Sequence, residues 1–131
     1  MEYYAAHIET ILDYLATRPF TLVHGDYHPK QMFFPTAEGG NFAVIDWQFS
    51  FVAQGAWDLA RIVVTGQDAA SRRERESALI TQYHDGIKAR GVEDYSREAL
   101  EDDFRLGILV NRMIMMIAIG GYGHRAGSTG V

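Results

Sequence analysis

Residues 21–48 read TLVHGDYHPKQMFFPTAEGGNFAVIDWQ, and three short apolar runs in this stretch enclose its densest polar cluster. Short apolar runs bounded by turn residues are typical of strands. The second and third runs are separated by Gly39-Gly40, which is a turn signal. The sequence therefore predicts strands at Thr21–Val23, Met32–Phe34 and Phe42–Ile45, with the last two paired as a small β-hairpin.

Two polar segments lie beside these runs. The loop His24-Gly25-Asp26-Tyr27-His28-Pro29-Lys30-Gln31 separates the first two runs, and Ile45-Asp46-Trp47-Gln48 ends the third. The predicted hairpin brings Gln31 and Asp46 near each other at one end, with Asp26 on the same side. Two carboxylates and an amide oxygen make an oxygen-rich site of the kind that Mg²⁺ prefers. We therefore expect a functional loop held by a rigid frame.

The rest of the sequence has mainly helical periodicity. Pro19 ends the first predicted helix, and Gly120-Gly121 ends the last. A capping box, in which Ser71 is followed by Glu74, starts the third helix, and Ser96 caps the fourth. The predicted helices span about residues 3–17, 57–64, 72–89 and 97–119. We therefore expect an α+β, mostly helical fold in a single domain over residues 1–131.

The composition narrows the class of protein. The chain has 131 residues, of which 47% are hydrophobic and 22% charged, as in a globular domain rather than a disordered chain. Its net charge of −5 repels a phosphate backbone, so we expect no nucleic-acid partner, and a polyanionic substrate would need a local basic pocket. The chain has no cysteine, no visible signal peptide and no uninterrupted apolar span, which favours a cytoplasmic protein without a membrane partner.

Three sequence elements occur in a fixed order with short spacers. They are His24-Gly25-Asp26 with the loop to Gln31, then Ile45-Asp46-Trp47, then Gly55-Ala56-Trp57-Asp58-Leu59-Ala60. In these elements the chain resembles the aminoglycoside phosphotransferase and choline kinase-like family, relatives of the protein kinases. The residues of its motifs are most similar to those of the ecdysteroid-kinase-like members. The resemblance covers about residues 10–65 by motif. It implies a protein-kinase-like C-terminal lobe whose small β-hairpin carries the catalytic and metal-binding loops.

The resemblance also implies an activity and its residues. The enzyme would be a phosphotransferase that moves the γ-phosphoryl group of ATP to a hydroxyl of a small molecule, with ATP and Mg²⁺ as cofactors. Asp26 would accept or orient the proton of the attacking hydroxyl, and Asp46 would hold Mg²⁺. Gln31 stands where the family has a metal-binding Asn and reaches one methylene further. The residues that support the loop or face the substrate would be His24, His28, Lys30 and Asp58.

These supporting residues have more than one possible role. Lys30 either contacts a phosphate or is solvated, and His28 either faces the substrate or supports the loop. Asp58 either caps its helix or braces the catalytic loop. Exposed carboxylates at Glu101–Asp103 are candidates for meeting a cationic acceptor.

A kinase of this type needs a nucleotide-binding lobe with a strand lysine on the phosphates. The chain has only two lysines, Lys30 and Lys88, and neither fits that place. We therefore expect the C-terminal lobe alone, weakly active or inactive by itself, with the N-terminal lobe separate or missing. A lone lobe exposes the apolar face that meets its partner, so self-association is also expected.

Two other functions stay open. One is a degenerate, non-catalytic kinase lobe that acts as a binding module. The other is a metal-dependent hydrolase, in which His24, Asp26, His28 and Asp46 hold a divalent metal that activates water.

Overall fold

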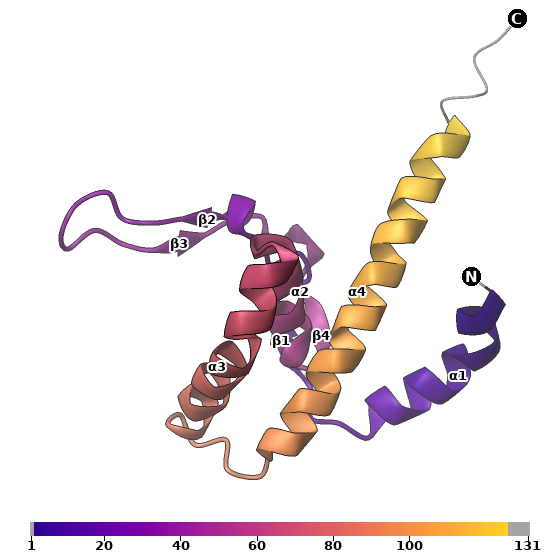
Figure 1. Cartoon of the computed structure of the whole chain (residues 1–131), viewed down its shortest axis with the longest axis horizontal. Coiled ribbons are helices and arrows are strands. Elements are labelled where there is room, and N and C mark those ends of the chain that lie inside the picture. Colours follow the sequence, from indigo (N-terminus) through magenta and orange to yellow (C-terminus); the bar gives the residue numbers. More distant parts are fainter. Residues whose placement is uncertain (1, 126–131) are drawn as a thin grey trace, which may run out of the picture.

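The computed structural model of the chain describes residues 2–125, with side chains described between residues 6 and 112 except at 8 and 12. Helices make up most of it, and the strands are short (Figure 1). This content is compatible with an α+β fold. The elements are, in order, α1 Glu2–Ala16, β1 Thr21–Val23, β2 Met32–Phe33, β3 Ala43–Val44, β4 Phe51–Ala53, α2 Ala56–Gly66, α3 Ala69–Lys88 and α4 Arg97–Arg125, with short 3₁₀ turns at Pro29–Gln31 and Trp47–Phe49.

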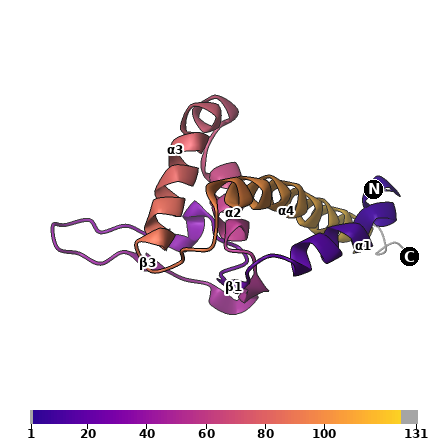
Figure 2. The same cartoon turned by 90° about the horizontal axis from the view of Figure 1, so that it is seen from below.

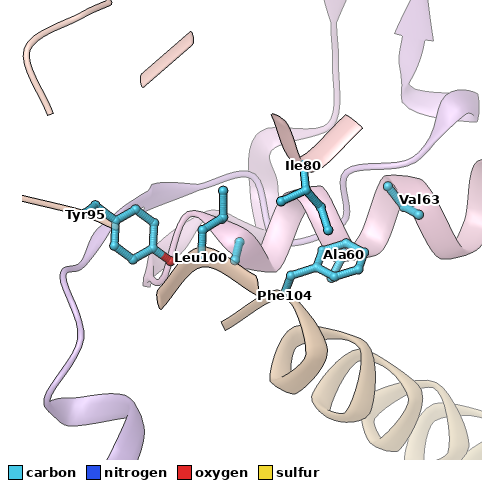
Figure 3. Close-up of a cluster of buried hydrophobic side chains, with 7 residues drawn as sticks. Ala60, Val63, Ile80, Tyr95, Leu100 and Phe104 are labelled. Carbon is cyan, nitrogen blue, oxygen red and sulfur yellow. The ribbon is translucent and has the colours of Figure 1, made fainter. Parts of the chain in front are cut away.

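Helix α2 forms the centre of the helical part. It packs most extensively on α4, and α3 lies against both helices. The crossing of α2 and α4 is close because small residues meet there: a Cβ atom on Gly107 would lie 3.0 Å from the Cβ of Ala60. Around this crossing the main core brings together three helices and the segment before α4, and its buried residues are Ala56, Ala60, Val63, Ile80, Tyr95, Leu100 and Phe104 (Figure 3).

The four strands form two separate antiparallel pairs. In the predicted hairpin, Met32 pairs with Val44 and Phe33 with Ala43, so that prediction is confirmed over a shorter length. The hairpin extends away from the helices in both views (Figures 1 and 2). The other pair joins β1 to β4, a strand that the sequence reasoning missed. This second pair fixes the start of the polar loop, because β1 ends where the loop begins.

Two helix ends differ from the predictions. Asp68, not Ser71, caps α3: its carboxylate accepts hydrogen bonds from the N–H groups of Ala70 and Ser71, at 2.9 and 3.0 Å. The Ser71 hydroxyl itself donates to the Asp68 carboxylate at 2.6 Å, so Ser71 lies within the first turn of α3 and does not cap it. Helix α4 continues through Gly120-Gly121 to Arg125, because glycine weakens a helix without breaking it. The Ser96 cap is confirmed by a bond from the N–H of Ala99 to its hydroxyl.

Helix α1 is anchored at its C-terminal end. Arg18 donates to the buried carboxylate of Asp103 on α4 at 2.9 Å, and the Tyr95 hydroxyl donates to the other oxygen of Asp103 at 2.5 Å. The buried Gln54 amide also donates to the carbonyl of Leu15. Within residues 2–125, no helix is long and apolar enough to cross a membrane.

Candidate functional site

The polar loop between β1 and β2 turns sharply at Gly25. This residue has a φ of +85°, in the left-handed region, and a Cβ atom here would overlap the carbonyl oxygen of Phe49. The indole N–H of Trp57 donates to the Gly25 carbonyl at 3.2 Å. Glycine is therefore the residue that lets the chain pass against the Trp57 and Phe49 segments.

Asp58, in the first turn of α2, braces this loop. Its two carboxylate oxygens accept hydrogen bonds from the N–H of His24 at 2.6 Å and of Gly25 at 3.1 Å. Burial raises the pKa of Asp58 above its ordinary value, and the two N–H groups offset only part of that rise. Of the two roles that the sequence left open for Asp58, the geometry is that of a brace.

His24 ties the same loop to the end of β3. Its ring is buried, and Nε2 donates to the carbonyl of Ile45 at 2.8 Å. A carbonyl only accepts, so Nε2 carries the proton and Nδ1 accepts the N–H of Asp26, at 3.3 Å. Its ring centroid lies 4.8 Å from that of Trp47. The Asp26 loop and the Asp46 turn are therefore held in register through one histidine.

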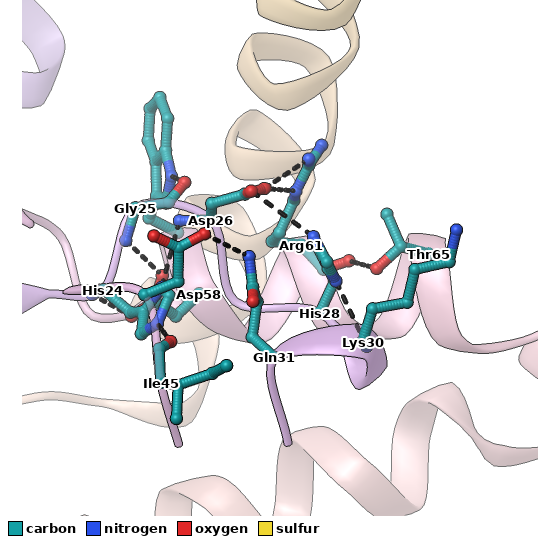
Figure 4. A network of polar contacts seen from close by, with 12 residues as sticks. His24, Gly25, Asp26, His28, Lys30, Gln31, Ile45, Asp58, Arg61 and Thr65 are labelled. Carbon is teal, nitrogen blue, oxygen red and sulfur yellow. Dashed lines mark hydrogen bonds and ion pairs between the residues drawn. The ribbon is translucent and has the colours of Figure 1, made fainter. Parts of the chain in front are cut away.

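Asp26 lies between two basic side chains (Figure 4). Arg61, one turn after Asp58 on α2, donates to Oδ1 from Nε at 3.1 Å and from Nη2 at 2.5 Å. Nε2 of His28 lies 3.3 Å from Oδ2. Burial alone would raise the pKa of Asp26, but Arg61 and His28 outweigh it and lower the pKa below its ordinary value.

Asp46 and Gln31 meet as the hairpin prediction implies. The Gln31 amide N–H donates to Oδ2 of Asp46 at 2.8 Å. Asp46 has a φ of +67°, and it is the one non-glycine residue with a positive φ in the described part of the chain. Its Oδ1 accepts no hydrogen bond from the described residues. A carboxylate and an amide suit Mg²⁺, provided that the amide turns to present its oxygen.

A pocket of about 440 Å³ opens beside Asp26. Arg61 and His28, which contact the Asp26 carboxylate, also line this pocket. Its lining residues are His28, Pro29, Lys30, Arg61, Thr65 and Gly66. Sequence reasoning missed Arg61 and Thr65. The spacing of three residues puts Asp58 and Arg61 on one face of α2, but it does not indicate that this face meets Asp26.

Two expectations do not fit this geometry. The four-ligand metal site of the hydrolase hypothesis is wrong, because both nitrogens of His24 are used by backbone groups. The described residues contain no group of three or more His, Asp or Glu side chains that could hold a metal. The carboxylates expected to meet a cationic acceptor are each paired: Asp103 with Arg18, Asp102 with Arg105, and Glu101 with Arg97.

Comparison with models of known protein families matches most of the chain. A family model named DUF1679 and described as "Uncharacterized oxidoreductase dhs-27" matches residues 4–126. No curated protein and no solved structure matches the chain. Since the match spans nearly all of the sequence, the chain belongs to the DUF1679 family, which lies in the ecdysteroid and choline kinase-like group.

Proposed function

We propose that the chain is the catalytic and substrate-binding lobe of a phosphotransferase. The enzyme would move the γ-phosphoryl group of ATP to a hydroxyl of a small molecule. The observation that carries this proposal is the bond from His24 to the Ile45 carbonyl, because it holds the Asp26 loop against the Asp46 turn. The position of the family in the kinase-like group supports the same function.

Asp26 would orient the attacking hydroxyl. Its lowered pKa makes the carboxylate a weak base, which suits orienting the hydroxyl rather than deprotonating it, and Arg61 uses only Oδ1. His28 contacts Oδ2 but does not occupy all of its lone pairs. Oδ2 can therefore also accept a hydrogen bond from the substrate O–H. Phosphoryl transfer has a loose transition state. Asp26 would therefore contribute to the rate mainly by positioning the hydroxyl.

Asp46 and Gln31 are the residues that would hold Mg²⁺. When bound, the ion neutralises charge on the β- and γ-phosphates. Oδ1 of Asp46 is available as a ligand without rearrangement. The Gln31 amide has to turn so that its oxygen, instead of its N–H group, faces the ion. Mg²⁺ sites are usually completed by phosphates and water, so one carboxylate and one amide are sufficient protein ligands.

A nucleotide-binding lobe would complete the enzyme. The described strands form only two-stranded sheets, and we propose that the lobe is a separate or additional segment in the cytoplasm. Large apolar side chains are exposed on one face of the β1–β4 pair, where Leu22 and Val52 lie opposite each other. This face is our candidate for docking of that lobe, or for self-association in its absence.

The test is transfer of label from [γ-³²P]ATP to a panel of small hydroxy compounds. We expect transfer when the chain is combined with a separately supplied nucleotide-binding lobe, and little or none with the chain alone. In the active pair, Asp26→Asn should lower kcat by about 10²-fold, because the attacking hydroxyl is no longer positioned by a carboxylate. Asp94→Asn, on an exposed residue before α4, is the matched control. Unchanged turnover in Asp26→Asn would show that the catalytic assignment is wrong.

A second candidate is the degenerate lobe that binds a ligand without catalysis. The contact from Gln31 to Asp46 favours it, because an N–H donor lies where a metal would bind. ATP-dependent transfer that needs Mg²⁺ and is lost in Asp46→Ala would exclude this candidate.

The word oxidoreductase in the family description raises a redox function. Dinucleotide-binding folds place a glycine-rich loop between a parallel strand and a helix. The described strands pair antiparallel, and the glycine-rich segment Gly121–Arg125 lies inside α4. The geometry therefore gives this function no support.

A further inference from the structure

The pocket beside Asp26 is unusual in its charge. Lys30 and Arg61 line it, and no carboxylate is among its lining residues. Lysine and arginine are both charged at neutral pH, and the chain as a whole has a net charge of −5. Because Arg61 is paired with Asp26, the uncompensated positive charge at this pocket is that of Lys30.

Among the residues whose side chains the structure describes, Lys30 has no acidic partner. No ion pair reaches its ammonium group from any of the described residues. Its backbone is held in place, because the Lys30 N–H donates to Nδ1 of His28 at 3.2 Å. An exposed lysine on a fixed backbone at a pocket rim is free to meet a ligand's negative group.

Arg61 also retains donors. A guanidinium has five N–H groups, and Asp26 takes bonds from Nε and Nη2, which leaves Nη1. The backbone carbonyl of Arg61 accepts the Thr65 hydroxyl at 2.6 Å. Lys30 and Arg61 thus present donors toward one pocket from two different elements (Figure 4).

We propose that this pocket binds an oxyanion group of the acceptor, so that the substrate is a negatively charged hydroxy compound. That the anion belongs to the acceptor rests on the proposed phosphotransferase function. The existence of the anion site does not depend on that function. Charge-assisted bonds from Lys30 and Arg61 hold the anion, and the substrate hydroxyl then lies toward Asp26. The volume of about 440 Å³ suits a small metabolite.

The probe is inorganic phosphate, added to the full chain without nucleotide. Since Lys30 and Lys88 are the only lysines, ¹³C-dimethylation gives two lysine side-chain signals in NMR spectra besides that of the α-amino group. We expect a saturable shift of the Lys30 signal and none at Lys88, which lies exposed at the end of α3. Lys30→Ala should weaken phosphate binding about tenfold by calorimetry, and Lys88→Ala should not change it.

Three outcomes decide the proposal. Equal shifts of both lysines, or no shift, would overturn it, because the pocket would then be ordinary surface charge. A Lys30 shift that disappears when Mg²⁺ and AMP-PNP are bound would assign the anion site to the nucleotide donor and overturn the acceptor assignment. A shift that persists beside bound AMP-PNP supports it.

The proposed phosphotransferase function can be tested separately from the anion site. AMP-PNP binding is followed by its own ³¹P signals. If the assembled enzyme binds no nucleotide, the phosphotransferase proposal fails, while the Lys30 result still reports on the anion site.

Discussion

Gly25 combines a left-handed backbone with a contact that leaves no room for a side chain. Gly39, at the tip of the hairpin, has a similar φ of +79° but open space around it. We expect Gly25→Ala to destabilise the chain by about 3 kcal/mol, since backbone strain and steric overlap add. Gly39→Ala should cost only the strain, about 1 kcal/mol. Urea unfolding of the two variants measures the difference, and equal losses would show that the Phe49 contact is relieved at no cost.

Asp26 should give the protein a pH-dependent stability. Its pKa is lower in the folded chain than its ordinary value near 3.8, so folding favours the ionised form. The stabilisation is therefore complete above about pH 4 and is lost as the pH falls through the lowered pKa. We expect Asp26→Asn to destabilise the chain at pH 7 and to differ less from the wild type at pH 3. The free energy of unfolding at both pH values, with Asp94→Asn as control, tests the sign.

Most of the candidate site could be predicted because its residues are adjacent in sequence. His24, Asp26 and Gln31 lie in one loop, and the hairpin brought Asp46 to Gln31. Arg61 could not be found in this way, because its contact with Asp26 depends on how α2 is turned against the loop. That rotation is set by tertiary packing, which local sequence patterns do not contain.

At the scale of elements, the crossing of α2 and α4 depends on a missing side chain. A Cβ atom added at Gly107 would lie 3.0 Å from the Cβ of Ala60 and 3.2 Å from the carbonyl oxygen of Ala56. We expect Gly107→Ala to lower the stability by about 1 kcal/mol, because overpacking exceeds the gain in helix propensity. Gly86→Ala on α3, where the added Cβ would meet only the end of the Arg90 side chain at 3.6 Å, should instead raise it by about 0.5–1 kcal/mol. Thermal unfolding of both variants is the measurement, and stabilisation by both would show that the helices can separate freely.

Element types were easier to predict than their ends. Four helices and the hairpin followed from periodicity and turn residues. The strand Phe51–Ala53 was missed because a run of three apolar residues is too short to show the alternation typical of a strand. Only its pairing with β1 makes this segment a strand. The start of α3 moved to Asp68 because two acceptable caps, Asp68 and Ser71, lie within one turn.

At the scale of the whole molecule, the buried carboxylate of Asp103 and the buried amide of Gln54 hold the C-terminal end of α1 against the rest. Removing Arg18 leaves Asp103 buried with only the Tyr95 hydroxyl as a partner. We expect Arg18→Ala to destabilise the chain by about 3 kcal/mol and to speed amide hydrogen exchange in α1. Arg105→Ala removes an exposed ion pair with Asp102 and should cost less than about 1 kcal/mol. Equal effects of the two substitutions would contradict this account of how α1 is attached.

Helix α2 supplies both the brace of the loop, Asp58, and the partner of Asp26, Arg61. An extra residue between them would turn Arg61 by about 100° around the helix axis, away from Asp26. In contrast, the exposed residues 35–41 at the tip of the hairpin could be lengthened without moving either contact. Family members are therefore expected to differ in length at the hairpin, while the interval from Asp58 to Arg61 tolerates no insertion or deletion.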